Sequence, residues 1–246
     1  MDIRQLVLVC EKKDEAINNL CNLFDIKVAY HDPGIIFFGL ENALLPVGNS
    51  FIEVISPVEE GTTAGRFLER RKGDGGYMVI IQVDDFLKSK EKVNKSGIDI
   101  VFESDDPLAR AIHLHPKQLG GAILSLDVMN PPESWKWAGP EWQNFIETKT
   151  AETIIGVQIQ SSDPVKMKER WQSVLTVNSP KDSSNNIINL DATDIEFVEN
   201  EDSRGEGVTA FKIKVKDVEA VNKKASQLNL LHNGEIVIGG VKFLLS

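Results

Sequence analysis

Two hydrophobic periods alternate along this chain, and the alternation repeats four times. Each time, a short apolar run typical of a β-strand precedes a segment with apolar residues at helical spacing. In the first such segment, Ile17, Leu20 and Phe24 fall on one helical face. The strand–helix units begin near residues 3, 77, 153 and 208, and further strand-like runs follow each of them. We therefore predict four copies of a βαβββ module.

An aspartate stands where each predicted helix begins. The expected N-cap residues are Asp14, Asp84 or Asp85, Asp163 and Asp217. An aspartate side chain accepts hydrogen bonds from the first free N–H groups of a helix, which explains this preference. Pro164 strengthens the third helix start, and Gly97 marks the expected end of the second helix.

The ratio of helices to strands predicts an α+β fold with mixed sheets rather than a doubly wound parallel sheet. Residues 131–150 divide the chain, because the prolines there cannot continue a helix or a central strand. We expect two halves of two modules each, residues 1–130 and residues 151–246, with the second half trimmed. The three tryptophans of the linker are expected to cover the boundary between the halves. A polar loop is expected at residues 177–186.

Composition narrows the classes of function. The chain has 246 residues and a net charge of −10. This acidic balance argues against nonspecific contact with nucleic acid or anionic lipid, and no apolar run approaches the roughly 18 residues that span a bilayer. We expect neither nucleic acid nor membrane as a partner. The start of the chain has no signal-peptide pattern, and Cys10 and Cys21 form no CxxC motif, so a cytoplasmic protein is expected.

Several segments resemble the vicinal oxygen chelate superfamily, which includes glyoxalases, methylmalonyl-CoA epimerase, extradiol dioxygenases and bleomycin-resistance-type proteins. The segments that carry the resemblance are "NSFIEVISPV", "TTAGRFLERRKGDGG", "GYMVIIQVDD" and "LHPKQLGGAILSLD". They resemble, in that order, the metal-ligand strand of the first module, the loop before the second module, its opening strand, and its closing strands. The resemblance implies two glyoxalase-like halves, in which paired modules curl their sheets into a cup around a small-molecule site.

In active members of the superfamily, four strand residues bind one divalent ion. The resemblance assigns these positions to Gln5, Glu53, Met78 and Ser125. Gln5 and Glu53 could bind Mn, Fe, Co, Ni or Zn, whereas a thioether and a neutral hydroxyl are poor ligands for such ions. The metal site is therefore expected to be incomplete, and a bound metal is disfavoured. The corresponding positions of the second half are Gly156, Glu196, Ala210 and Leu244.

Other polar residues are candidates for catalysis or ligand contact. Glu53 could act as an acid or a base, since a carboxyl group in an apolar cup can have a raised pKa. His113 and His115 would share one face of a strand. They could form half of a metal site, contact a substrate, or be ordinary residues at a strand end. Lys117 and Arg66 could contact an anionic ligand or lie solvated on the surface.

The sequence predicts a glyoxalase-like protein that binds or transforms a small, anionic organic molecule in the cup of its first half. Three alternatives stay open. One is a metal-dependent lyase or isomerase of the glyoxalase I or methylmalonyl-CoA epimerase type, and another is a ring-cleaving dioxygenase. The third is a non-catalytic drug-binding protein of the bleomycin-resistance type. The pattern leaves open whether the chain is an enzyme, and whether it is a monomer or a homodimer.

Overall fold

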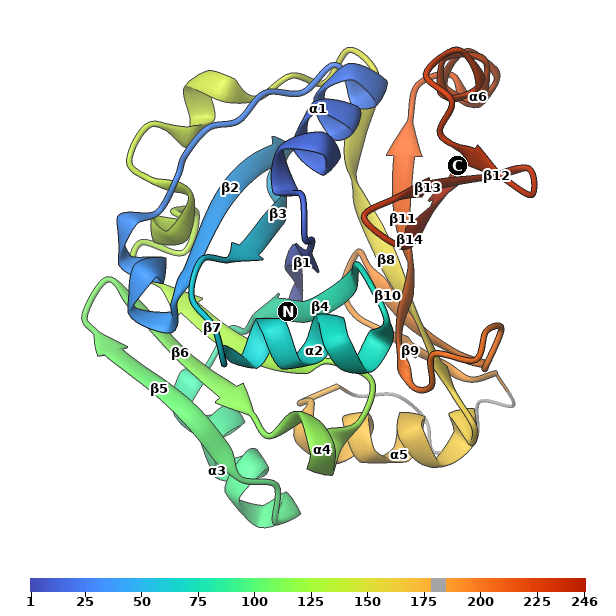
Figure 1. The fold of residues 1–246 in the computed structure, drawn as a ribbon. Helices are drawn as coiled ribbons and strands as arrows, with labels where there is room; N and C mark the ends of the chain where they lie inside the picture. Colours follow the sequence, from blue (N-terminus) through green and yellow to red (C-terminus); the bar gives the residue numbers. More distant parts are fainter. Residues whose placement is uncertain (178–184) are drawn as a thin grey trace.

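The computed structural model describes residues 1–177 and 185–246, so residues 178–184 of the loop expected at residues 177–186 lie outside it. Two halves lie side by side, the first in blue to green and the second largely in orange to red (Figure 1). The strands of the first half are β1 (Asp2–Val9), β2 (Leu40–Val47), β3 (Ser50–Pro57), β4 (Gly75–Gln82), β5 (Ile100–Asp106), β6 (Ala109–Leu114) and β7 (Ile123–Met129).

The described residues of the second half form seven further strands, which differ in length. They are β8 (Ala151–Ser161), β9 (Ile187–Asn189), β10 (Asp194–Glu199), β11 (Gly207–Val215), β12 (Leu231–His232), β13 (Glu235–Ile238) and β14 (Val241–Leu245).

The α-helices are α1 (Lys13–Phe24), α2 (Thr63–Arg71), α3 (Phe86–Ser96), α4 (Pro116–Leu119), α5 (Pro164–Val174) and α6 (Val218–Gln227). Three short 3₁₀-helices accompany them: η1 (Pro33–Phe38), η2 (Lys136–Ala138) and η3 (Trp142–Phe145). Within the described residues, no helix is both long and apolar enough to cross a bilayer.

Both halves repeat one strand topology. The first half has the order β2-β3-β1-β4-β7-β6-β5, and the second has β9-β10-β8-β11-β14-β13-β12. In the first half β1 lies parallel to β3 and antiparallel to β4, and β4 lies parallel to β7. The equivalent pairs β8–β10, β8–β11 and β11–β14 have the same directions. The predicted α+β class with mixed sheets is confirmed.

The first module departs from the expected run of strands. Residues Pro33–Phe38 form η1 instead of a strand, and only a bridge between Tyr30 and Leu44 remains of the additional pairing. Pro33 has no N–H to donate to a ladder. The Asp32 side chain also accepts a hydrogen bond from the Gly34 nitrogen at 2.8 Å, which favours a turn.

Three of the four predicted helix caps are confirmed. Asp85, Asp163 and Asp217 each accept a hydrogen bond from the backbone nitrogen three residues later. The prediction for Asp14 is wrong, because α1 begins at Lys13 and Asp14 lies in its first turn. There its carboxylate still interacts favourably with the positive end of the helix dipole.

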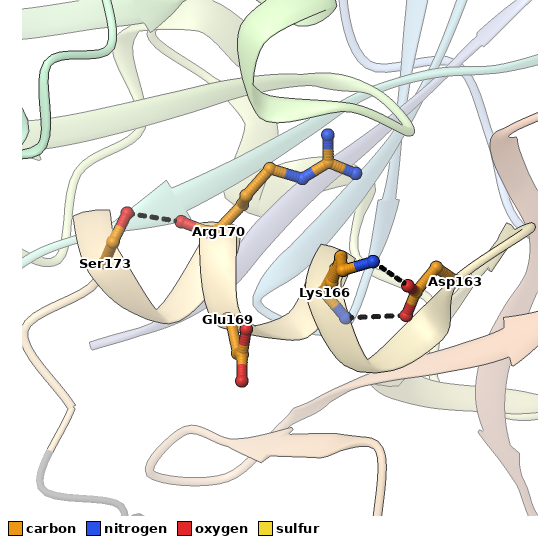
Figure 2. Close-up of a pocket in the computed structure, with 5 residues that line it drawn as sticks. All are labelled: Asp163, Lys166, Glu169, Arg170 and Ser173. Carbon is orange, nitrogen blue, oxygen red and sulfur yellow. Dashed lines mark hydrogen bonds and ion pairs between the residues drawn. The ribbon is translucent and has the colours of Figure 1, made fainter.

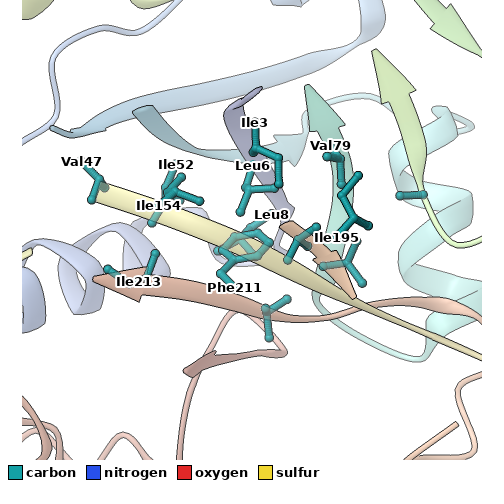
Figure 3. Close-up of a cluster of buried hydrophobic side chains, with 14 of the residues drawn as sticks. Ile3, Leu6, Leu8, Val47, Ile52, Val79, Ile154, Ile195, Phe211 and Ile213 are labelled. Carbon is teal, nitrogen blue, oxygen red and sulfur yellow. The ribbon is translucent and has the colours of Figure 1, made fainter. Parts of the chain in front are cut away.

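The helix-bearing faces of the two halves share one hydrophobic core (Figure 3). Leu6 and Val79 of the first half belong to the same buried cluster as Ile154 and Phe211 of the second. Because side chains alternate along a strand, the neighbours of Leu6 on β1 face the other way. That second face of the first-half sheet carries the candidate site.

Gly76 lies where a strand of the first half pairs with a strand of the second half. β11 pairs with β4 at Val208 and Gly76, and a Cβ atom on Gly76 would lie 2.5 Å from the Val208 Cβ. We expect Gly76→Ala to lower the free energy of unfolding by about 2 kcal/mol, since overpacking forces the backbones apart. Urea denaturation measures this loss.

The partner variant Val208→Gly serves as the control for this prediction. If the contact is the cause, the double variant loses less stability than the sum of the two single losses. Strict additivity would contradict the proposed clash.

Candidate functional site

The second face of the first-half sheet forms a concave surface, which we call the cup. Its strand residues are Gln5, Val7, Val9, Phe51, Glu53, Ile55, Met78, Ile80, Ile123, Ser125 and Asp127. The register places Val7 beside Glu53 and opposite Met78, and it places Ile80 beside Ser125. The four positions assigned by resemblance therefore lie on one surface, contributed by β1, β3, β4 and β7.

Glu53 is the buried centre of a hydrogen-bond network. Gln5 Nε2 donates to Glu53 Oε2 at 2.7 Å, and Asn42 Nδ2 donates to Glu53 Oε1 at 2.7 Å. The Glu53 side chain is only 7% exposed. Burial raises the pKa of Glu53 to about 7, although the two amide donors oppose the shift. Glu53 can therefore exchange a proton near neutral pH.

Asp127 is a second buried carboxyl in the cup, and sequence reasoning missed it. Ser125 Oγ donates to Asp127 Oδ1, and Trp137 Nε1 donates to Asp127 Oδ2 at 2.7 Å. Burial raises the pKa of Asp127 to about 7. One signal could have found it: Asp127 stands two positions after Ser125, so the strand period puts both side chains on the same face.

Tryptophans of residues 131–146, which we call the tryptophan segment, fill the cup. Trp135 is 1% exposed, and its Nε1 donates to Gln5 Oε1 at 2.7 Å. Its ring stacks on the Phe51 ring with the centroids 6.0 Å apart. The Trp142 ring contacts the Phe51 ring edge-on, with the centroids 4.9 Å apart. The prediction that these tryptophans cover the boundary between the halves is wrong. The apolar strand residues of the cup offer them a larger surface to bury.

Arg4 is a cation that lies against these rings. Its guanidinium carbon is 5.5 Å from the Trp135 ring centroid and 5.7 Å from that of Phe51. The β1–β4 register skips Arg4 at a bulge between Ile3 and Gln5. Burial lowers the pKa of Arg4. Sequence reasoning missed this residue, since nothing local in the sequence marks the bulge.

The donor atoms of the cup do not fit a divalent metal ion. Both Glu53 oxygens accept hydrogen bonds from amides, and Gln5 Oε1 accepts one from Trp135. Met78 and Ser125 add a thioether and a hydroxyl, which bind such ions poorly. Across the described residues, three or more His, Cys, Asp or Glu side chains nowhere gather in a metal-binding arrangement.

The chain is similar to known proteins. The family model described as "Glyoxalase-like domain" matches residues 6–175, which is more than half of the chain. The chain belongs to the glyoxalase-like domain family. Together with the fold, this places the protein in the vicinal oxygen chelate superfamily.

Relatives of this glyoxalase-like protein differ in what they are named for. The ethylmalonyl-CoA/methylmalonyl-CoA epimerase of Cereibacter sphaeroides is 23% identical over 93 residues, covering 36% of this chain and 69% of the relative. A mutant 4-hydroxymandelate synthase from Streptomyces coelicolor has a TM-score of 0.69 at 14% identity, over 93% of this chain and 75% of its own. Methylmalonyl-CoA epimerase from Mycobacterium tuberculosis has a TM-score of 0.47 at 20% identity, over 56% and 92%. The synthase structure shows that the two-half fold extends along nearly the whole chain.

His113 and His115 of the glyoxalase-like protein do not share a strand face. His113 lies on β6 opposite Ser125, with its ring centroid 4.6 Å from that of Phe102. Burial lowers the pKa of His113 to about 4, so the ring is neutral at pH 7. His115 lies beyond the strand and caps α4, where its Nδ1 accepts a hydrogen bond from the Lys117 nitrogen at 3.2 Å. The expected pairing is wrong because Pro116 begins a helix.

Lys117 and Arg66 lie on the surface. The Lys117 side chain is exposed at the start of α4. Arg66 is held by its own loop, since its guanidinium donates to the Gly61 carbonyl and, at 3.0 Å, to Thr63 Oγ1. A direct role in the cup for either residue stays a prediction.

The equivalent face of the second half is ion-paired. Glu196 lies beside Gln158 on β8, as Glu53 lies beside Val7. Lys212 contacts Glu196 at 2.8 Å, and Gln158 Nε2 donates to Glu196 at 2.9 Å. Although burial acts in the opposite direction, these hydrogen bonds hold the pKa of Glu196 below its ordinary value. Gly156, Ala210 and Leu244 contribute no polar side chains, so Glu196 is the one metal-binding side chain among the four equivalent positions, and its charge is already paired with Lys212.

A hollow of about 490 Å³ lies along α5 (Figure 2). It is lined by Asp163, Lys166, Glu169, Arg170 and Ser173. Lys166 pairs with the cap residue Asp163 at 2.9 Å, and the lining side chains extend along one helix face. This arrangement is typical of a solvated helix surface. The cup therefore remains the better candidate for the functional site.

Proposed function

We propose that this chain binds a small organic molecule in its cup without a metal, and that the tryptophan segment closes the cup when no ligand is present. One observation carries the proposal. Glu53 and Asp127 are buried beneath indole rings, and among the described residues their hydrogen-bond partners are neutral groups. Burying carboxyl groups without a cation costs free energy, and such groups are typical of binding sites.

The composition of the cup supports the same function. Its walls are apolar, with a few convergent polar groups, which is the usual make-up of a small-molecule site. Arg4 supports the idea that the ligand carries negative charge, because its guanidinium lies against the rings that fill the cup. The metal-dependent alternatives, a lyase and a ring-cleaving dioxygenase, receive no support from the donor atoms of the cup.

The tryptophan segment is built so that it can leave the cup. Its backbone forms short local hydrogen bonds, such as Ala138 to Trp135 at 3.0 Å and Asn144 to Glu141 at 3.0 Å. In the described structure it forms 3₁₀ turns and no named strand. Its displacement would leave the strand ladders intact, so the segment can open locally without unfolding of the sheet.

Indole N–H signals in NMR spectra test the proposal. The chain has four tryptophans, and three of them lie in the tryptophan segment. Titration with the anionic aromatic probe 1-naphthalenesulfonate, which has no N–H group, is expected to shift the Trp135 and Trp137 signals in a saturable manner. Trp171, which is fully buried in the shared core, is the internal control and keeps its position. A shift of Trp171 alone, or of none of the signals, would contradict binding in the cup.

A second candidate function is proton transfer at a carbon beside a carbonyl group, as in an isomerase or epimerase. The pKa values of Glu53 and Asp127, raised by burial to about 7, favour it, because an acid or base works best near the ambient pH. Deuterium uptake by methylmalonyl-CoA in heavy water, followed by mass spectrometry, is the assay. Glu53→Gln is expected to slow uptake at least ~100-fold, and Glu196→Gln, the equivalent change in the second half, leaves it unchanged. Equal effects of both changes would rule this function out.

We also propose that the protein acts as a monomer in the cytoplasm. The strands that form the cup all belong to one half of one chain, so the cup needs no residues from a second copy. The thiols of Cys10 and Cys21 are both unbonded, which suits a reducing compartment.

A further inference from the structure

We propose that the ligand of the cup is a planar aromatic molecule with an N–H donor, such as an indole, and that Trp135 occupies its place when the cup is closed. The inference rests on the function proposed above and names its ligand class. It follows from how the cup holds the indole ring that now fills it.

Two flat groups, the Phe51 ring and the Arg4 guanidinium, lie against the Trp135 ring and against each other. Phe51 lies nearly parallel to the indole, with an interplanar angle of 11°. The Arg4 guanidinium, 5.5 Å from the Trp135 ring centroid, adds a cation–π contact. Such a recess selects planar rings, because stacking and cation–π attraction both require an extended π surface.

The edge of the ring meets an acceptor whose direction is fixed. Gln5 Nε2 donates to Glu53, which leaves Gln5 Oε1 pointing at the indole N–H. The amide of Gln5 cannot turn round without presenting its N–H₂ to another donor. A ligand without an N–H would leave this buried carbonyl oxygen without a partner, so the cup discriminates between N–H rings and their carbon analogues.

Asp127 repeats this pattern. Its Oδ2 accepts from the Trp137 indole at 2.7 Å, while its Oδ1 is occupied by Ser125. Two indole N–H groups of the tryptophan segment thus donate hydrogen bonds to two acceptors of the cup, Gln5 and Asp127. The cup offers inward-facing acceptors at two places, which favours a donor-bearing ligand.

Calorimetric titration with indole and with indene, its carbon analogue, tests the inference on the full-length chain. Trp135→Phe keeps an aromatic ring but removes the N–H bonded to Gln5, which weakens the closed state. Because apparent affinity scales with the open fraction, this variant is expected to bind indole about tenfold more tightly than the native chain. Indene is expected to bind at least about tenfold more weakly than indole.

Trp171→Phe is the matched control. It removes an equally buried indole N–H, which donates to the Gly120 carbonyl at 3.1 Å outside the cup. It is expected to lower the thermal midpoint and leave indole affinity unchanged. Equal affinity gains in both variants would overturn the idea that Trp135 occupies the ligand's place.

The outcomes separate this inference from the proposed function. Equal affinity for indole and indene would overturn the N–H class. If the naphthalenesulfonate probe shifts the Trp135 signal while neither indole nor indene binds, the ligand class is wrong and binding in the cup stands. If none of the three probes binds, the proposed function fails together with the inference.

Discussion

Replacing Trp135 with alanine is expected to lower the free energy of unfolding by about 3 kcal/mol. The indole is 1% exposed and stacks on Phe51, and its loss leaves the Gln5 carbonyl oxygen without its donor. A large buried ring commonly costs more than this. The loss is limited here because the tryptophan segment of the variant can open and admit water. The decrease in the free energy of unfolding therefore cannot exceed the free energy that keeps this segment closed in the native chain. Urea denaturation measures the change.

Trp171→Ala provides the comparison. Trp171 is fully buried in the core shared by both halves, where no local opening can relieve the cavity. We expect a loss of about 5 kcal/mol for this variant. Equal losses for the two variants would contradict a closing segment that opens independently.

Stability is expected to fall as the pH rises from about 4.5 to about 7. Burial raises the pKa of Glu53 from 4.5, and of Asp127 from 3.8, to about 7 in the folded protein. Between these pKa values the folded state binds more protons than the unfolded state, so the free energy of unfolding falls as the pH rises. The stabilising contribution of each carboxyl group is complete only below the pKa that the group has in the unfolded state. That contribution is lost as the pH rises to 7, at a cost on the order of 3 kcal/mol for each group.

His113 acts in the opposite direction over part of the same window. Burial lowers its pKa from 6.5 to about 4, so the unfolded state binds the extra proton between these values. Its contribution to stability therefore grows as the pH rises from about 4 to 6.5. The contributions of the two carboxyl groups exceed the opposing contribution of the imidazole, so the free energy of unfolding shows a net fall on the order of 3 kcal/mol.

The double variant Glu53→Gln with Asp127→Asn distinguishes these contributions. With both carboxyl groups removed, the contribution of His113 is no longer outweighed, so stability is expected to rise with pH instead of falling. The free energy of unfolding, measured by urea denaturation at intervals from pH 4.5 to 7.5, gives the sign directly. A falling profile in the double variant would show that other groups cause the effect. Asp202 is not one of them, because hydrogen bonds from Gln160 and Arg204, acting against burial, lower its pKa to about 2.

Local patterns were sufficient for most of the fold. Period changes located the modules, and the cap residues located three helix starts, because these signals act within a few neighbours along the chain. Pro33 and Asp32 show the limit of this reasoning, since they convert an apolar run into η1. An apolar run alone does not distinguish a strand from a short turn that packs on one.

The site was predicted less completely, because its contacts join distant residues. The resemblance to the superfamily placed Gln5 and Glu53 on the cup, but the hydrogen bond from Trp135 to Gln5 spans 130 positions. No periodicity encodes such a contact. Arg4 faces the rings through a strand bulge, which is a property of the pairing rather than of one segment. Asp127 alone could have been found, from strand alternation.

In evolutionary terms, the two halves have the same strand topology, as two copies produced by a duplication would have. Both copies keep a glutamate at the same strand position, Glu53 in one and Glu196 in the other. The register places Lys212 where Ile80 stands in the first copy, and this lysine neutralises Glu196. Under the proposed function the first copy holds the ligand, while the equivalent face of the second copy carries an ion pair. The second half then serves the first as a permanent scaffold, by burying its helix-bearing face.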